Sequence, residues 1–104
     1  METTPVLGQV RTRLAAAFGK RLKGIVLYGS EARHEAAPDS DIDLMVLLEG
    51  PVQAGKDLDT IIHALYPLQL ELDRLIDAWP ADAAAYERQE FAVYRNARRE
   101  GILI

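Results

Sequence analysis

Two short apolar runs, each with a polar end, place the strongest constraint on how this chain folds. The first, Ile25-Val-Leu-Tyr28, is followed at once by Gly29-Ser30, and the second is preceded by Asp41-x-Asp43, which follows the serine after ten intervening residues. Glycine and serine at the end of a strand offer open backbone N–H groups and a hydroxyl, which suit a polyphosphate. Aspartates spaced i, i+2 on a strand project from one face and can share divalent cations. Together these patterns predict a site for a metal-bound nucleoside triphosphate.

Composition limits the classes of protein to consider. The chain has 104 residues, of which 49% are hydrophobic and 27% charged, so we expect one globular domain over residues 1–104. A net charge of −4 argues against a general nucleic-acid-binding surface, and the lack of cysteine excludes disulfides and thiolate metal sites. Glu2 lies near the start and no apolar run is long enough to span a membrane. We therefore expect a cytoplasmic protein that binds no membrane.

Hydrophobic periodicity predicts alternating helices and strands. The expected elements are a helix over 5–18, a strand within 24–29, a short helix over 30–34, a strand over 41–48, a helix over 57–66, a strand over 68–78, a helix over 82–100 and an edge strand over 102–104. In 68–78, alternating leucines favour the strand, although Leu68, Leu72 and Leu75 also fit a helix. The order indicates a small α/β (α+β) fold with one mixed sheet and helices packed against it.

Two other phosphate or metal motifs are incomplete here. A calcium-binding loop starting at the aspartates would need glycine where Leu44 stands and glutamate where Gly50 stands. The stretch from Gly50 to Lys56 resembles a phosphate-binding loop, but Asp57 replaces its Ser or Thr and would repel phosphate. We interpret this stretch as an ordinary turn between a strand and a helix.

The two complete motif halves point to a known family. Gly29-Ser30-Glu31-Ala32-Arg33 and Ser40-Asp41-Ile42-Asp43-Leu44 resemble the G-S-x-A-R and S-D-I-D-L signature of minimal nucleotidyltransferase (MNT) domains. These domains belong to the DNA polymerase β-like nucleotidyltransferase superfamily, and the resemblance extends over nearly the whole chain. It implies the small nucleotidyltransferase fold and transfer of a nucleoside monophosphate to an acceptor hydroxyl, with release of pyrophosphate.

The resemblance also implies roles for the motif residues. Asp41 and Asp43 would hold two Mg²⁺ ions, about 3.5–4 Å apart in sites of this kind. Gly29, Ser30 and Arg33 would bind the triphosphate of the donor, which we expect to be ATP.

A third carboxylate completes the site in this family, inside an apolar-Asp-apolar pattern on a later strand. Leu72-Asp73-Arg74-Leu75-Ile76 is the match that we favour, so Asp73 is expected to bind metal and to accept the proton of the attacking hydroxyl. Arg74 departs from the pattern, which leaves Glu71 and Asp77 as alternatives.

The acceptor is expected to arrive on another chain, because no additional helical domain for a small molecule is visible. Stand-alone domains of this family commonly act as antitoxins of HEPN-domain ribonuclease toxins, and some attach AMP to a toxin tyrosine. The resemblance thus implies a toxin–antitoxin system, with an adenylylating antitoxin in a heteromeric complex with its toxin. A non-catalytic antitoxin that acts by contact, and a small-molecule nucleotidyltransferase completed by a separate helical subunit, are the alternatives.

Overall fold

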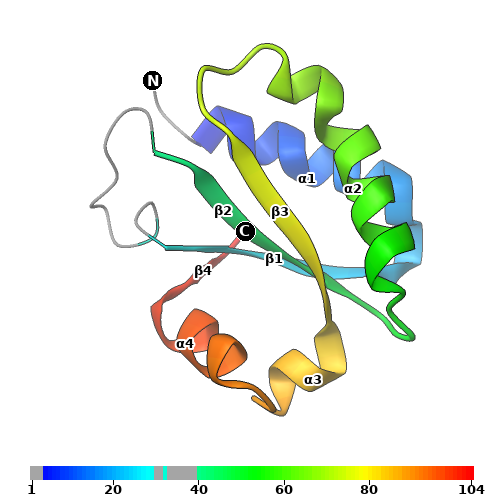
Figure 1. The fold of residues 1–104 in the computed structure, drawn as a ribbon, viewed down its shortest axis with the longest axis vertical. Helices are drawn as coiled ribbons and strands as arrows, with labels where there is room; N and C mark the ends of the chain where they lie inside the picture. Colours follow the sequence, from blue (N-terminus) through cyan, green and yellow to red (C-terminus); the bar gives the residue numbers. More distant parts are fainter. Residues whose placement is uncertain (1–3, 30–31, 33–39) are drawn as a thin grey trace.

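A computed structural model describes residues 4–29, 32 and 40–104 of the chain. Helices lie on both faces of one four-stranded sheet (Figure 1). The elements are α1 (Thr4–Phe18), a 3₁₀ turn (Gly19–Arg21), β1 (Leu22–Tyr28), β2 (Ile42–Leu48), α2 (Ala54–Gln69), β3 (Ile76–Asp82), α3 (Ala83–Glu87), α4 (Ala92–Glu100) and β4 (Ile102–Leu103). The predicted fold class, an α+β fold with one mixed sheet, is confirmed.

The sheet has the strand order β3-β2-β1-β4. β1 and β2 are antiparallel, with a register that runs from Leu22 opposite Leu48 to Tyr28 opposite Asp43. β3 runs parallel to β2, and α2 forms the crossover between them. β4 pairs with β1 through two residues and confirms the predicted edge strand. One end of the sheet therefore brings together the end of β1 and the beginnings of β2 and β3.

The two faces of the sheet bury separate apolar clusters, because side chains alternate along each strand. One face packs against α1 and α2 through buried residues such as Leu14, Leu44 and Ile61. The other face packs against α3 and α4 through Met45 and Tyr86 among others. Most of β2 is buried on both faces, as expected for a central strand.

The predicted strand over 68–78 was wrong. α2 continues through Gln69, and β3 begins only at Ile76. Leu68 is buried on the helix face that also carries Ile61 and Leu65, whereas Leu70 is 68% exposed. Neither pattern holds over residues 70–75, which form a turn and a bend, since α2 includes Leu68 but not Leu72 or Leu75. Pro67 is accommodated in the last turn of α2.

The predicted long C-terminal helix is divided into α3 and α4. Asp82 caps α3, as its carboxylate accepts hydrogen bonds from the N–H groups of Ala84 (2.8 Å) and Ala85 (3.2 Å). The break follows at Gln89, whose φ of +54° is incompatible with a continuous helix. None of the helices in the described ranges is long and apolar enough to cross a membrane.

Candidate active site

The two motif halves meet at the end of the sheet where β1 stops and β2 starts. Gly29 follows β1 with a φ of +75°, a left-handed conformation that glycine adopts without a steric penalty. A Cβ atom built on Gly29 would lie 2.6 Å from the carboxylate Oδ2 of Asp43. A glycine is therefore required here both by the backbone angle and by the closeness of the aspartate.

A second carboxylate lies beside the first on the neighbouring strand. Asp43 of β2 and Asp77 of β3 are direct partners in the parallel register, so both side chains leave the sheet on the same face. This is the face covered by α3 and α4, since Met45 and Trp79 are the next residues on that side. Asp41 precedes β2 by one residue and adds a third negative charge to the group.

The three aspartates are electrostatically unfavourable together. Burial raises the pKa of Asp43, and the charges of Asp77 and then Asp41 raise it further. No ion pair among the described residues neutralises any of these carboxylates. Such a cluster is the donor chemistry that a hard divalent cation requires, since Mg²⁺ prefers carboxylate oxygens.

The three aspartates have the oxygen atoms that a magnesium site needs, but their side chains are not already arranged around a cation. Within the described ranges, no three acidic or histidine side chains already surround a common cation position. Asp43 and Asp77 are the pair whose backbones the sheet holds side by side, with Asp41 next to them. These three residues are the ones in the described part of the chain that could hold magnesium at this end of the sheet.

Asp73 does not lie in the strand where it was expected. It is exposed in the bend that precedes β3, whereas the alternative residue Asp77 lies opposite Asp43. Glu71, the other alternative, is exposed in the turn after α2. A sequence signal for the better placed residue exists, because Ile76-Asp77-Ala78 fits an apolar-Asp-apolar pattern without the charged neighbour that follows Asp73.

Two polar side chains hold β3 in the register that brings the aspartates together. The Gln69 amide at the end of α2 donates to the carbonyl of Arg74 (2.8 Å) and accepts from the N–H of Ile76 (2.7 Å). Arg74 is itself buried, and its Nε donates to the carbonyl of Ser40 (2.7 Å), just before Asp41. The segment leading into β3 is thus anchored to both α2 and the start of β2.

Two aromatic residues that the sequence did not single out border the carboxylates. Tyr28 is the β1 partner of Asp43, and its hydroxyl accepts a hydrogen bond from the indole N–H of Trp79. Their rings meet edge to face with centroids 6.0 Å apart. Burial raises the pKa of Tyr28, and the charges of Asp43 and Asp77 add to this rise against the opposing effect of the indole hydrogen bond.

Some predicted binding residues cannot be placed. Ser30 and Arg33 lie outside the described residues, while Gly29 is placed against Asp43 as described above. Ala32, from the same motif, is described and is buried in the core on the α1–α2 side of the sheet. The predicted triphosphate-binding group is thus represented in the described structure by Gly29 alone.

The opposite end of the β1–β2 pair contains a carboxylate in a very different setting. Asp57, near the start of α2, is buried and makes two 3.0 Å hydrogen bonds with the guanidinium of Arg21. Its Oδ2 also accepts the N–H of Gln53 at 3.0 Å. Arg21 further donates to the carbonyls of Glu49 and Pro51, so it fastens the connection from β2 to α2. These contacts agree with our interpretation of this stretch as a structural turn rather than a phosphate-binding loop.

Comparison with known protein families gives a match over most of the chain. The sequence model of the family described as "Nucleotidyltransferase domain" matches residues 7–103. No curated protein shows significant similarity to the chain. Because the match includes the described elements from α1 to β4, the chain belongs to the nucleotidyltransferase domain family.

Proposed function

We propose that this nucleotidyltransferase domain transfers AMP from ATP to a hydroxyl group, a tyrosine side chain, of a HEPN-domain toxin and thereby acts as its antitoxin. Membership of the family supports nucleotidyl transfer in general. The finer proposal rests on the resemblance of the two motif halves to those of minimal nucleotidyltransferase domains. The structural observation that supports a nucleotidyl-transfer site is the closeness of Gly29 to Asp43, together with the position of Asp77 directly opposite Asp43 on the neighbouring strand.

Each carboxylate has a role in this proposal. Asp41, Asp43 and Asp77 would hold two Mg²⁺ ions, and Asp77 takes the place first assigned to Asp73. Bound magnesium would neutralise the triphosphate and stabilise the charge that develops during transfer. The acceptor oxygen forms a bond to the α-phosphorus, the bond from that phosphorus to the β-phosphate oxygen breaks, and pyrophosphate leaves. Asp77 accepts the hydroxyl proton, because it is the exposed member of the facing pair.

Gly29 supplies space rather than a functional group. The left-handed turn brings the main chain that follows β1 within van der Waals distance of the Asp43 carboxylate, with no side chain between them. A triphosphate bound by this turn would therefore lie next to the carboxylates that bind its metal ions. Ser30 and Arg33 remain the proposed partners of the phosphate tail.

The decisive experiment measures the covalent product. The chain is purified together with the toxin encoded by its neighbouring gene, incubated with ATP and Mg²⁺, and both proteins are weighed by intact-mass spectrometry. We expect the toxin to gain one or more AMP units and to lose ribonuclease activity. No mass gain together with full neutralisation would favour the contact-only antitoxin. Transfer only to a small molecule would favour the third alternative.

Two matched variants identify the third carboxylate. Asp77→Asn and Asp73→Asn each remove one negative charge from the α2–β3 region, but only the former faces Asp43. We expect Asp77→Asn to abolish labelling and Asp73→Asn to retain it. The reverse result would restore Asp73 to the role that the sequence first suggested.

A further inference from the structure

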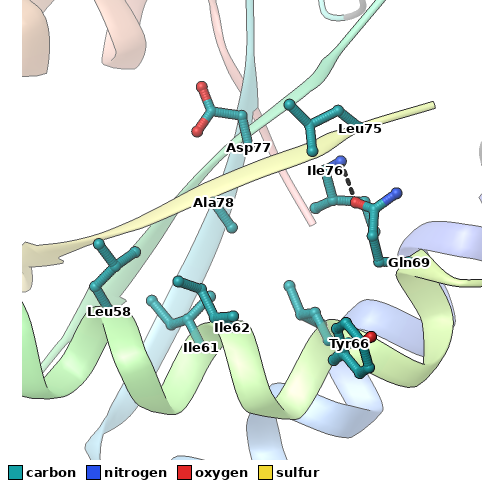
Figure 2. A pocket seen from close by; sticks show the side chains of 10 residues that line it. Leu58, Ile61, Ile62, Tyr66, Gln69, Leu75, Ile76, Asp77 and Ala78 are labelled. Atoms are coloured by element: carbon teal, nitrogen blue, oxygen red, sulfur yellow. Dashed lines mark hydrogen bonds between the residues drawn. The ribbon is translucent and has the colours of Figure 1, made fainter.

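An apolar groove runs between α2 and the edge strand β3. It has a volume of about 350 Å³ and is shown from close by in Figure 2. Its walls include Leu58, Ile62 and Tyr66 from α2 and Leu75 and Ala78 from the β3 side. Nothing on the described part of the chain covers this groove, because β3 is the last strand of the sheet on that side.

The groove exposes more apolar surface than isolated surface side chains would. Ile62 is 53% exposed, Tyr66 57% and Leu75 55%, and all three border the same groove. Leu70, in the turn after α2, is 68% exposed. A contiguous apolar surface of this kind on a small protein is typical of an interaction site.

The edge of β3 is protected against addition of another strand. The side chain of Gln69 already occupies the N–H of Ile76 and the carbonyl of Arg74. Pro80, in the second half of β3, has no N–H to donate. An occupant of the groove would therefore be recognised by its side chains, as a helix laid into an apolar groove is, and not by main-chain pairing.

Negative charge lies in the turn that leads from α2 to Leu75 at one end of the groove. None of the described residues that line the groove is basic, and Asp77, the charged one among them, directs its carboxylate away from α2. Glu71 and Asp73 are exposed in the turn between Leu70 and Leu75. An apolar helix with basic residues along its flanks would complement this surface in both hydrophobicity and charge.

The strand that borders the groove also carries a residue of the candidate active site. Asp77 lies on β3 between Ile76 and Ala78, whose side chains face α2, while its carboxylate points away from α2 (Figure 2). The same strand thus presents an apolar groove on one side and a site carboxylate on the other. A protein bound along this edge would hold neighbouring hydroxyl groups close to Asp77.

We propose that this groove docks an amphipathic helix of the acceptor protein, with an apolar stripe against α2 and basic residues toward the exposed acids Glu71 and Asp73. The proposal rests on the function proposed above, since it assigns the surface by which the acceptor is held. It predicts that docking and nucleotidyl transfer depend on different residues of this chain.

The test uses the full-length toxin as the probe and compares three variants. Ile62→Asp places a charge in the groove, Val93→Asp places one on the exposed surface of α4, and Asp43→Asn removes a proposed metal ligand. We expect Ile62→Asp to weaken toxin binding at least about 10-fold in calorimetry. Val93→Asp and Asp43→Asn should bind as the wild type does. Stabilisation of Ile62→Asp and Val93→Asp by Mg²⁺ and ATP in thermal unfolding shows that their nucleotide site is intact, whereas Asp43→Asn should lose this stabilisation.

A photo-crosslinking residue at position 62 identifies the occupant. Crosslinks to a helix of the toxin support the proposal, whereas crosslinks to a second copy of this chain would overturn it. Wild-type affinity of Ile62→Asp, or failure of the wild-type chain to bind the toxin, would also overturn it. If the toxin binds through the groove but never gains AMP, the proposed transfer is wrong while the docking surface stands.

Discussion

Asp57 and Asp43 are two aspartates at opposite ends of the same antiparallel strand pair, and their surroundings have opposite electrostatic character. The guanidinium of Arg21 donates two hydrogen bonds to Asp57, and this holds the pKa of its carboxyl below the ordinary value of 3.8. Asp43 has no ion-pair partner among the described residues, and burial and neighbouring acids raise its pKa above that value. One end of the sheet has its charges balanced within the fold, while the other end brings acidic groups together without an ion-pair partner among the described residues.

The contrast suits different roles for the two aspartates, stability for Asp57 and the proposed chemistry for Asp43. A buried carboxylate with its hydrogen bonds satisfied stabilises the fold and has no capacity left for a ligand. A carboxylate among like charges costs stability, and such groups cluster at functional sites. Four predictions test this division, beginning with the largest expected effect.

Asp43→Asn should reduce AMP transfer at least about 10³-fold, because the amide cannot replace a charged metal ligand next to the triphosphate. The rate is measured by intact mass at saturating Mg²⁺ and ATP. Asp57→Asn is the matched control, since it makes the same chemical change at the balanced end and should transfer at the wild-type rate per folded molecule. An equal loss of transfer rate in both variants would contradict the different roles of Asp43 and Asp57.

Asp57→Asn should instead lower the free energy of unfolding by about 2–3 kcal/mol, since it leaves the guanidinium of Arg21 without its anion beside the start of α2. Urea denaturation at neutral pH, without Mg²⁺, measures this loss. Asp43→Asn is expected to be at least as stable as the wild type under the same conditions. A loss of stability in Asp43→Asn would show that its charge is balanced by a group outside the described residues.

Gly29→Ala should reduce transfer by about 10–100-fold, because the added methyl group displaces the Asp43 carboxylate that lies 2.6 Å from its position. The left-handed φ adds about 1–2 kcal/mol of instability. Steady-state kinetics and urea denaturation measure the two effects. Gly55→Ala, a change in α2 with no atom within 4 Å of the new methyl group, should be active and slightly more stable. Normal activity of Gly29→Ala would show that Asp43 can move without consequence.

The smallest effect is a pH dependence that has opposite signs at the two ends. The folded chain binds a proton at Asp43 more tightly than the unfolded chain does, so this residue costs stability as pH rises from 3.8 through its raised pKa. Asp57 gains stability as pH rises through its lowered pKa to 3.8. The increase in the free energy of unfolding caused by Asp43→Asn and the decrease caused by Asp57→Asn should therefore both become smaller as the pH falls. Denaturation series from pH 3 to pH 8 in EDTA measure both, and parallel curves would refute the assignment.

Much of the fold could be predicted because local patterns and tertiary packing agree. The continuous apolar runs that end at Tyr28 and begin at Ile42 became β1 and β2, and Asp82 caps a helix as its position before three alanines indicates. β3 was harder to predict, because Ile76 and Trp79 are its only strong strand formers and the rest is alanine, aspartate and Pro80. A proline in a strand is compatible with an edge position, and strand order is a property of the whole fold.

The apolar-Asp-apolar pattern occurs twice in approximate form, at Asp73 and at Asp77, and the choice of the proposed third carboxylate between them depends on the register of the strand. Asp73 and Asp77 differ by four residues, and either could face Asp43 if the strand began at a different place. The contacts of Gln69 and Arg74 help to fix where β3 starts, and that of Arg74 with Ser40 joins segments 34 residues apart in the sequence. The hydrogen bond between Tyr28 and Trp79 is likewise a tertiary contact that no local sequence pattern predicts.

The distance between the backbones of Asp43 and Asp77 is a property of the sheet, because neighbouring strands lie about 4.8 Å apart wherever they pair. Ionic strength and nucleotide identity have little influence on that spacing. A cation of a different radius would have to be accommodated by the two torsions of each aspartate side chain. At the magnesium site proposed above, discrimination among divalent cations would therefore depend on side-chain rotamers. Asp77→Glu, which adds a single methylene, is the smallest change that would alter this discrimination.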